Sequence, residues 1–223
     1  MSINITDVIF MIPALLMAVI FHEVAHGLVA YKLGDDTAKR EGRLTLNPIP
    51  HIDPLGSLLI PGILILLNSP ILFGYAKPVP INPLNFKIDM RKGIIITSFA
   101  GPGANFLLAF LFAGLYHLVK NETFLTYFAS IFGVGALESV IVPLAIFFKY
   151  AVSINLILSI FNLLPIPPLD GGNILLNLLP RELQEKIEPY EQFGFFLIIL
   201  LLMTGVIGFI ILPMYRFFMT ILM

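Results

Sequence analysis

The stretch His22-Glu23-Val24-Ala25-His26 could hold and use a metal ion. Residues four apart lie on the same face of a helix, so the imidazoles of His22 and His26 can bind one metal together. Glu23 is then placed to take a proton from water bound to that metal. The same pattern occurs by chance in soluble helices, where water solvates the side chains. Here it lies in a long apolar run, where unpartnered ionisable groups are costly, which favours metal binding.

A catalytic zinc site needs a third protein ligand and an open position. The chain has no cysteine and only 4 histidines, so this ligand is a histidine or a carboxylate. Asp170 is the strongest candidate, because it follows an apolar run that ends in prolines and its neighbouring glycines let the backbone approach closely. Its alternative role is to cap a short helix over 174–179. His51, in a polar loop, is the rival as a ligand or a substrate-facing residue, and His117 fits a membrane-interface position.

Two asparagines lie inside apolar runs and must find hydrogen-bond partners there. Asn105 and Asn162 could simply join helices to one another. They could equally flank the metal and bind a substrate carbonyl, or the oxyanion that develops on it. The sequence leaves both roles open.

The composition indicates an integral membrane protein. Hydrophobic residues make up 58% of the 223 residues and charged residues 12%, and the mean hydropathy is +0.94. A soluble domain of this size cannot bury so much apolar surface. The net charge of −1 offers no basic surface for nucleic acid. The N-terminus lacks the basic residues and cleavage site of a secretory signal, so we expect the first apolar run to remain as a span.

We expect an all-α polytopic membrane protein, in which one membrane-embedded domain over 1–223 forms a helical bundle around an intramembrane zinc site. About twenty apolar residues cross a bilayer, and four runs meet this requirement: 8–31, 94–119, 139–164 and 193–213. The run at 58–73 is short and contains Asn68-Ser69-Pro70, which predicts a re-entrant segment. Prolines and glycines predict a loop or short strand at 74–92, and an interfacial segment is expected at 124–137.

The basic residues predict how the chain is oriented. If 58–73 dips into the membrane and returns, ten of the 13 lysines and arginines share one side. This asymmetry is typical of a cytoplasmic face, so we expect the N-terminus outside and the zinc site toward the cytoplasm. The ten residues are Lys32, Lys39, Arg40, Arg43, Lys77, Lys87, Arg91, Lys92, Arg181 and Lys186.

Three motifs in this order resemble the site-2 proteases, a family of zinc intramembrane metalloproteases. They are His22-Glu23-Val24-Ala25-His26, then Gly101-Pro102-Gly103-Ala104-Asn105, then Asn162-Leu163-Leu164-Pro165-Ile166-Pro167-Pro168-Leu169-Asp170-Gly171-Gly172. The resemblance implies one zinc ion per chain held by His22, His26 and Asp170, with Glu23 as the catalytic acid/base. It also implies that Asn105 and Asn162 line the cleft. Because the chain has no PDZ or CBS domain, it resembles the compact prokaryotic branch, which implies a multi-pass protein of the inner membrane.

We therefore expect metal-assisted hydrolysis of peptide bonds in membrane-spanning substrates. A helical substrate must unwind locally, and the 74–83 stretch could offer a strand edge that pairs with it. The expected partners are a membrane-spanning protein or peptide and the lipid bilayer, with no nucleic acid. Two alternatives stay open. A metal transporter has no need of Glu23 and usually contains internal repeats, which the sequence lacks; a zinc-binding protein without activity has no need of Glu23 either.

Overall fold

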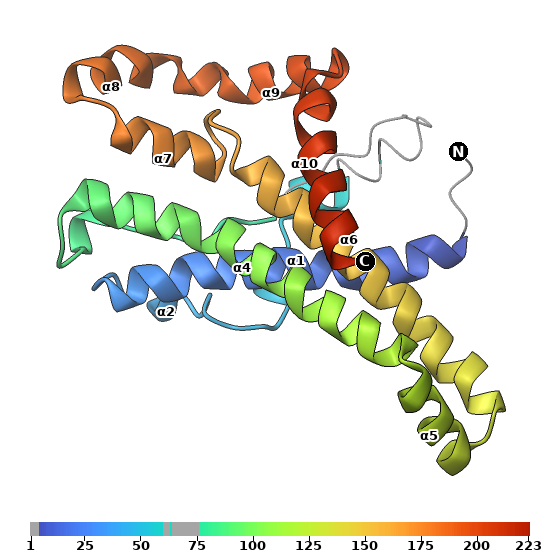
Figure 1. Cartoon of the computed structure of the whole chain (residues 1–223). Helices are drawn as coiled ribbons and strands as arrows, with labels where there is room; N and C mark the ends of the chain where they lie inside the picture. The colour runs from blue at the N-terminus through green and yellow to red at the C-terminus, as the bar shows by residue number, and fades with distance from the viewer. Residues whose placement is uncertain (1–4, 60–62, 64–75) are drawn as a thin grey trace.

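The computed structural model describes residues 5–59, 63 and 76–223. Three long helices form its centre (Figure 1): α1 (Ile5–Lys32), α4 (Met90–Lys120) and α6 (Val142–Asn162). Helix α4 packs against both α1 and α6, and α1 also contacts α6. Helices α1 and α4 are long and apolar enough to cross a membrane, and so is α6 when the turn that precedes it is included. The spans predicted at 8–31, 94–119 and 139–164 are thus helical, with boundaries shifted by a few residues.

Shorter elements join and extend the three long helices. Between α1 and α4 the structure has α2 (Thr37–Arg40), a 3-10 turn (Ile49–His51), a π-helical turn (Pro54–Leu59) and a second 3-10 turn (Pro83–Asn85). Helix α5 (Glu122–Phe132) and a π-helical turn (Leu137–Ile141) lead into α6. The chain then forms α7 (Asp170–Leu178), α8 (Arg181–Ile187), a 3-10 segment (Glu188–Phe193), α9 (Gly194–Met203) and α10 (Val206–Leu222).

Small side chains let the central helices approach one another. Ala14 of α1, Ala109 of α4 and Ala151 of α6 are fully buried in one cluster. Lipid tails are as apolar as leucine, so helices in a membrane associate through such close packing. Larger apolar side chains complete this cluster: Leu108, Phe112, Val152, Leu156 and Leu222. Many other large apolar side chains stay exposed on the outside of the bundle, as expected for a surface that faces lipid.

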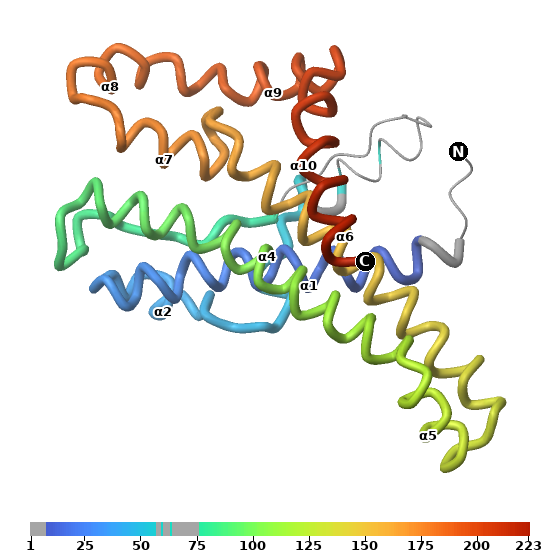
Figure 2. The backbone as a smooth tube through the Cα atoms, in the orientation of Figure 1, coloured from blue at the N-terminus to red at the C-terminus, as the bar shows by residue number. Residues whose placement is uncertain are grey.

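The span predicted at 193–213 is not one continuous helix. Helix α9 ends at Met203, α10 begins at Val206, and the two helices are bent by 74°. Between them Gly205 has a φ of +77°, a left-handed conformation that glycine adopts without strain and that ends a helix. The tube in Figure 2 turns sharply at this point, and α10 then runs toward α6. The fourth span predicted at 193–213 thus corresponds to a bent helix pair, whose two parts are long and apolar enough to cross a membrane only when taken together.

The other predicted segments differ in how far the structure describes them. The interfacial segment at 124–137 is mostly α5, which buries none of its residues. From residue 76 onward, the segment predicted as a loop or strand at 74–92 is irregular chain, a 3-10 turn and the start of α4; no strand occurs in the described ranges. The prolines at 78, 80 and 83 explain this, because proline has no N–H to give to a ladder. The re-entrant prediction for 58–73 lies outside the described residues, except for 58, 59 and 63.

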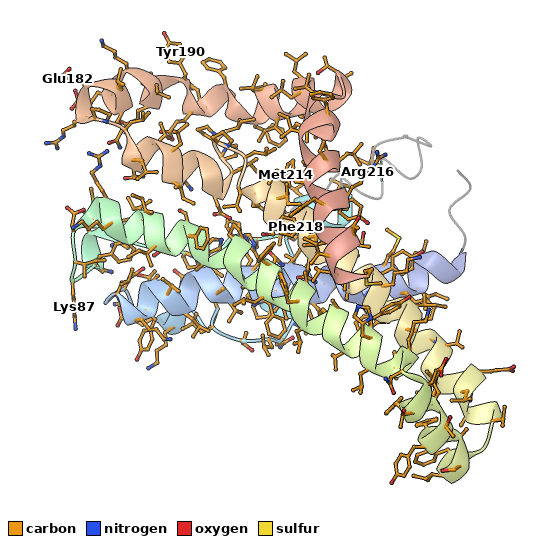
Figure 3. All side chains as sticks on the ribbon, in the orientation of Figure 1. Lys87, Glu182, Tyr190, Met214, Arg216 and Phe218 are labelled. Atoms are coloured by element: carbon orange, nitrogen blue, oxygen red, sulfur yellow. The ribbon has the colours of Figure 1, made fainter. Side chains whose placement is uncertain are left out.

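The end of α1 and the start of α4 are joined at one end of the bundle. The backbone N–H of Lys87 donates to the carbonyl oxygen of Leu33 over 2.8 Å. Asp89 caps α4 there by accepting a hydrogen bond from the backbone of Lys92. Figure 3 shows Lys87 at this end, on the same side of the view as Glu182 of α8. The chain between α1 and α4 therefore leaves and re-enters the bundle at one end.

Candidate active site

Three side chains that could bind a metal meet where α1 passes the start of α7. His22 Nε2 and His26 Nε2 are 3.0 Å apart, and Asp170 Oδ2 lies 3.2 Å from the first and 3.3 Å from the second. Both histidines are buried, and the Asp170 side chain is only 15% exposed. Within the described ranges, this is the one group of three or more possible metal ligands. The structure thus brings together the three residues that the sequence singled out.

The hydrogen bonds around this group fit a bound cation. His26 Nδ1 lies 2.7 Å from the carbonyl oxygen of Thr97, which can only accept, so in the neutral ring Nδ1 donates and Nε2 carries no hydrogen. His22 Nδ1 makes a similar contact of 2.6 Å with Oδ1 of Asn105. The buried Oδ2 of Asp170 has no hydrogen-bond donor among the described residues. Two bare ring nitrogens and a carboxylate oxygen therefore face one another, which is a donor set that zinc prefers.

A glycine in α4 makes room for the two imidazoles. A Cβ added at Gly101 would lie 2.6 Å from His22 Nε2 and closer still to His26 Nε2. No larger residue fits there unless the histidines move. This close approach gives the Gly101 motif of the sequence a steric purpose, because it lets α4 press against the ligand face of α1.

Asp170 reaches the histidines because the chain folds back tightly after α6. A Cβ at Gly172 would lie 2.6 Å from the carbonyl carbon of Ile166, and one at Gly171 would collide with the backbone of Leu163. These two glycines therefore allow α7 to begin directly against the end of α6. Asp170 is the first residue of α7, Leu169 occupies the N-cap position, and no side-chain cap bond forms. The alternative role of Asp170 as a helix cap is not observed.

Glu23 follows His22 in the sequence, and both residues line one cavity. Its Oε2 accepts a hydrogen bond of 2.8 Å from the backbone N–H of Val79. The cavity has a volume of about 530 Å³, and His22, Glu23 and Asn162 line it together with mostly apolar side chains from α1, α6 and α9. A carboxylate beside a possible metal site and open to a cavity can serve as a general base.

Known proteins similar to this chain identify its family. The profile of peptidase family M50 matches residues 10–203. The chain belongs to this family. It is 38% identical to "Putative zinc metalloprotease YwhC" of Bacillus subtilis over 92% of this chain and 85% of the relative. It is 31% identical to "Putative zinc metalloprotease Rip2" of Mycolicibacterium smegmatis, over 88% of this chain and 67% of that relative. No solved structure matches.

Membership of family M50 confirms the resemblance to site-2 proteases. Together with the names of its relatives, it supports a zinc metalloprotease. The apolar helices and the family together make it a multi-pass membrane protein.

The two asparagines take different positions in this M50 chain. Asn162 lines the cavity, with its Nδ2 bonded to the carbonyl oxygen of Leu158, so its role in the cleft stays a prediction. Asn105 is fully buried and does not line the cavity. Its amide contacts His22, the carbonyl oxygen of Ala18 and the side chain of Asn155. Of the two roles left open for Asn105, these contacts show that it joins α4 to α1 and α6; a role toward the substrate stays a prediction.

His51 lies apart from the three possible ligands. Its side chain is 2% exposed, and its Nε2 lies 2.9 Å from the carbonyl oxygen of Thr45. Its backbone oxygen accepts a hydrogen bond from the N–H of Lys77. His51 therefore joins the loop after α1 to the segment over residues 77–79, which passes Glu23. It is not part of the group that could hold a metal.

Three groups around this M50 site were not predicted from the sequence. The carbonyl of Thr97 and the N–H of Val79 belong to the backbone, which every residue carries, so no side-chain pattern marks them. Asn155 is different, because it is an amide inside an apolar helix and bonds to Asn105. Like Asn105 and Asn162, it must find a hydrogen-bond partner inside an apolar run, and this signal is present in the sequence.

Proposed function

We propose that this M50 protein is an intramembrane zinc metalloprotease that hydrolyses peptide bonds of membrane-spanning substrates. The observation that carries the proposal is the convergence of His22, His26 and Asp170 beside a cavity that Glu23 also lines. His22, His26 and Asp170 would hold a zinc ion, which would supply a water of lowered pKa and a Lewis acid for the peptide carbonyl. The names of the relatives support zinc as the metal.

The groups around the cavity have different roles in the proposed hydrolysis. Glu23 takes the proton from the attacking water and later passes it to the leaving amine. The N–H of Val79 fixes the orientation of the Glu23 carboxylate by donating to Oε2. Asn162 faces the cavity and can donate a hydrogen bond to the substrate carbonyl.

The substrate is expected to bind as an unwound segment of a membrane-spanning helix. A peptide bond inside an intact helix is already hydrogen-bonded and shielded, so the chain must open locally before it is cut. The irregular segment from Ala76 to Asn82 passes Glu23 and can lie along the opened substrate. Pro78 and Pro80 have no N–H, so the backbone of these two residues can bind the substrate only by accepting hydrogen bonds at the carbonyl oxygens. The excess of basic residues at the loops after α1 and before α4 supports an active site nearer the cytoplasm.

The decisive experiment compares the native protein with Glu23→Gln on a membrane-spanning substrate in detergent or vesicles. The glutamine oxygen can still accept from Val79, so the variant should fold and keep stoichiometric zinc. Cleavage should fall by about 100-fold or more, because the general base is gone. Appreciable cleavage by zinc-loaded Glu23→Gln would exclude this mechanism. A native protein that binds zinc but cuts no membrane-spanning substrate would support a binding role instead.

A further inference from the structure

We propose that Asn155 of α6 is a positioning residue for the His22 ligand, acting through Asn105. By accepting a hydrogen bond from Asn105, Asn155 acts together with the carbonyl oxygen of Ala18 to fix which end of the Asn105 amide faces His22, and so which ring nitrogen of His22 is free for metal. The proposal rests on the zinc site of the proposed function, and it gives a role to a residue outside the three motifs.

A chain of hydrogen bonds links α6 to α1 through α4. Asn155 Nδ2 donates to the carbonyl oxygen of Ala151 over 2.8 Å. Asn155 Oδ1 accepts from Asn105 Nδ2 over 2.9 Å, and Asn105 Oδ1 lies 2.6 Å from His22 Nδ1. Both asparagine side chains are 0% exposed, so water cannot replace a lost partner.

The direction of every bond in this chain follows from backbone carbonyls, which can only accept. Ala151 requires the NH₂ group of Asn155 on its side, which turns the Asn155 oxygen toward Asn105. The Asn105 NH₂ group is then held by two acceptors, Asn155 and the carbonyl oxygen of Ala18. The Asn105 oxygen must therefore face His22, whose Nδ1 donates to it. His22 Nε2 is left without hydrogen and points toward Asp170.

The tautomer of His26 does not depend on an asparagine amide. His26 Nδ1 contacts the carbonyl oxygen of Thr97, a group of fixed polarity held in α4. An asparagine amide can turn over by exchanging its oxygen and nitrogen, whereas a backbone carbonyl cannot. Loss of Asn155 should therefore affect His22 and leave the tautomer of His26 unchanged. This difference between the two ligands is specific to the proposal.

The first test reads the histidine rings in the zinc-free protein. The chain has only 4 histidines, so ¹⁵N-histidine labelling gives few signals, and the signal lost in His22→Gln identifies His22. In the native protein His22 should carry its hydrogen on Nδ1. Asn155→Leu is similar in shape but has no acceptor, so only Ala18 still holds the Asn105 NH₂ group and the amide can turn over in part of the molecules. His22 should then show a second tautomer beside the native one, while His26 stays unchanged. An unchanged His22 signal in Asn155→Leu would overturn the proposal.

The second test measures zinc affinity by competition with a chelator. Asn155→Leu should bind zinc about tenfold more weakly, as found when partners of metal ligands are removed. Asn155→Asp should bind zinc almost as the native protein does, because a protonated buried carboxyl can donate to Ala151 and accept from Asn105. If Asn155→Leu does not fold, Asn155→Ala takes its place in both tests with the same expectation.

The matched control is Ser159→Ala, one turn further along the same helix. Ser159 is 1% exposed and its Oγ donates to the carbonyl oxygen of Pro102, so the change also removes a buried bond between α6 and α4. It does not touch His22, and zinc affinity should stay at the native value. An equal loss of affinity in Ser159→Ala and Asn155→Leu would mean a general packing effect and would overturn the proposal. A native protein that binds no zinc would instead refute the proposed function, and the tautomer test would still decide the role of Asn155.

Discussion

At the scale of single residues, the site depends on a carboxylate that comes from a distant part of the sequence. Asp170 Oδ2 lies within 3.3 Å of both imidazole nitrogens, while His51 is engaged with a backbone carbonyl elsewhere. Asp170→Ala should therefore strip stoichiometric zinc from the purified protein, because three protein ligands are the minimum for such a site. His51→Ala should retain the zinc. Elemental analysis of the two variants measures this, and the opposite pattern of zinc content would exchange their roles.

A glycine of α4 controls the space available to the two histidines. Gly101→Ala places a methyl group 2.6 Å from His22 Nε2, a distance that real Cβ contacts essentially never show. The histidines must move, so we expect loss of zinc and of activity. Gly103→Ala is the matched control, because its Cβ would make only an ordinary contact of 3.6 Å with Phe99. Zinc content of both proteins after purification checks the prediction, and full zinc in Gly101→Ala would contradict it.

At the scale of elements, the segment that passes Glu23 is held by several separate contacts. Asp35, fully buried after α1, accepts hydrogen bonds from the backbone of Asn82 and from the Asn85 side chain. The Arg43 guanidinium donates to the carbonyl oxygen of Lys77 over 2.6 Å. Together with the bond from Val79 to Glu23, these contacts fix irregular chain where no regular ladder exists. The position of the Glu23 carboxylate is thus linked to the loop after α1.

Asp35 should contribute to stability over a wide range of pH. Burial opposes its ionisation, but hydrogen bonds from Thr37, Asn82 and Asn85 outweigh this and hold the pKa of Asp35 below its usual value of 3.8. A lowered native pKa gives stability that is complete above the usual pKa and is lost only as the pH falls through the native one. Asp35→Ala should lower the free energy of unfolding by about 2 kcal/mol. The difference from the native protein should persist down to about pH 4.5.

The neighbouring aspartate provides the control for this variant. Asp36 pairs with Arg40 on the surface, where both side chains are at least half exposed, and such pairs contribute about 0–1 kcal/mol. Asp36→Ala should therefore unfold almost as the native protein does. Thermal unfolding in detergent at several pH values measures both variants. A stability difference for Asp35→Ala that grows as the pH falls from neutral to about pH 5 would show that its native pKa is raised, contrary to the hydrogen bonds.

At the scale of the whole molecule, the bundle predicts which loops share a side of the membrane. The bond between Lys87 and Leu33 joins the start of α4 to the end of α1, and α4 carries the chain to Glu122 at its other end. Single cysteines can report this directly, because the chain has none of its own. Glu41→Cys and Ile88→Cys, both at exposed positions, should react only with reagent admitted to the cytoplasmic side. Glu122→Cys should react from outside intact cells.

Labelling of Ile88→Cys from outside, with Glu41→Cys still labelled from inside, would contradict this arrangement. It would mean that the chain crosses the membrane between α1 and α4. The end of α1 and the start of α4 would then lie on opposite sides of the membrane, whereas the hydrogen bond between Lys87 and Leu33 requires them to lie side by side.

The sequence by itself determined the possible metal ligands and the long helices. His22 and His26 are four residues apart on one helix, and the apolar runs of α1, α4 and α6 are local properties that need no knowledge of packing. Asp170 could be singled out because few ligand types remain in a chain without cysteine. The break between α9 and α10 has a weak signal in the sequence, because Gly205 follows Thr204 inside an apolar run. A single glycine at this place is equally compatible with a continuous helix.

Only the tertiary structure decided which groups surround those ligands. Asn105 lies on α4 and Asn155 on α6, and their contact depends on how the two helices are rotated against each other. The same holds for Val79, which reaches Glu23 through a backbone N–H that no side-chain pattern reveals. Hydrogen-bond partners in a membrane interior are set by helix packing, because every buried polar group must be satisfied by whichever group the packing brings within reach.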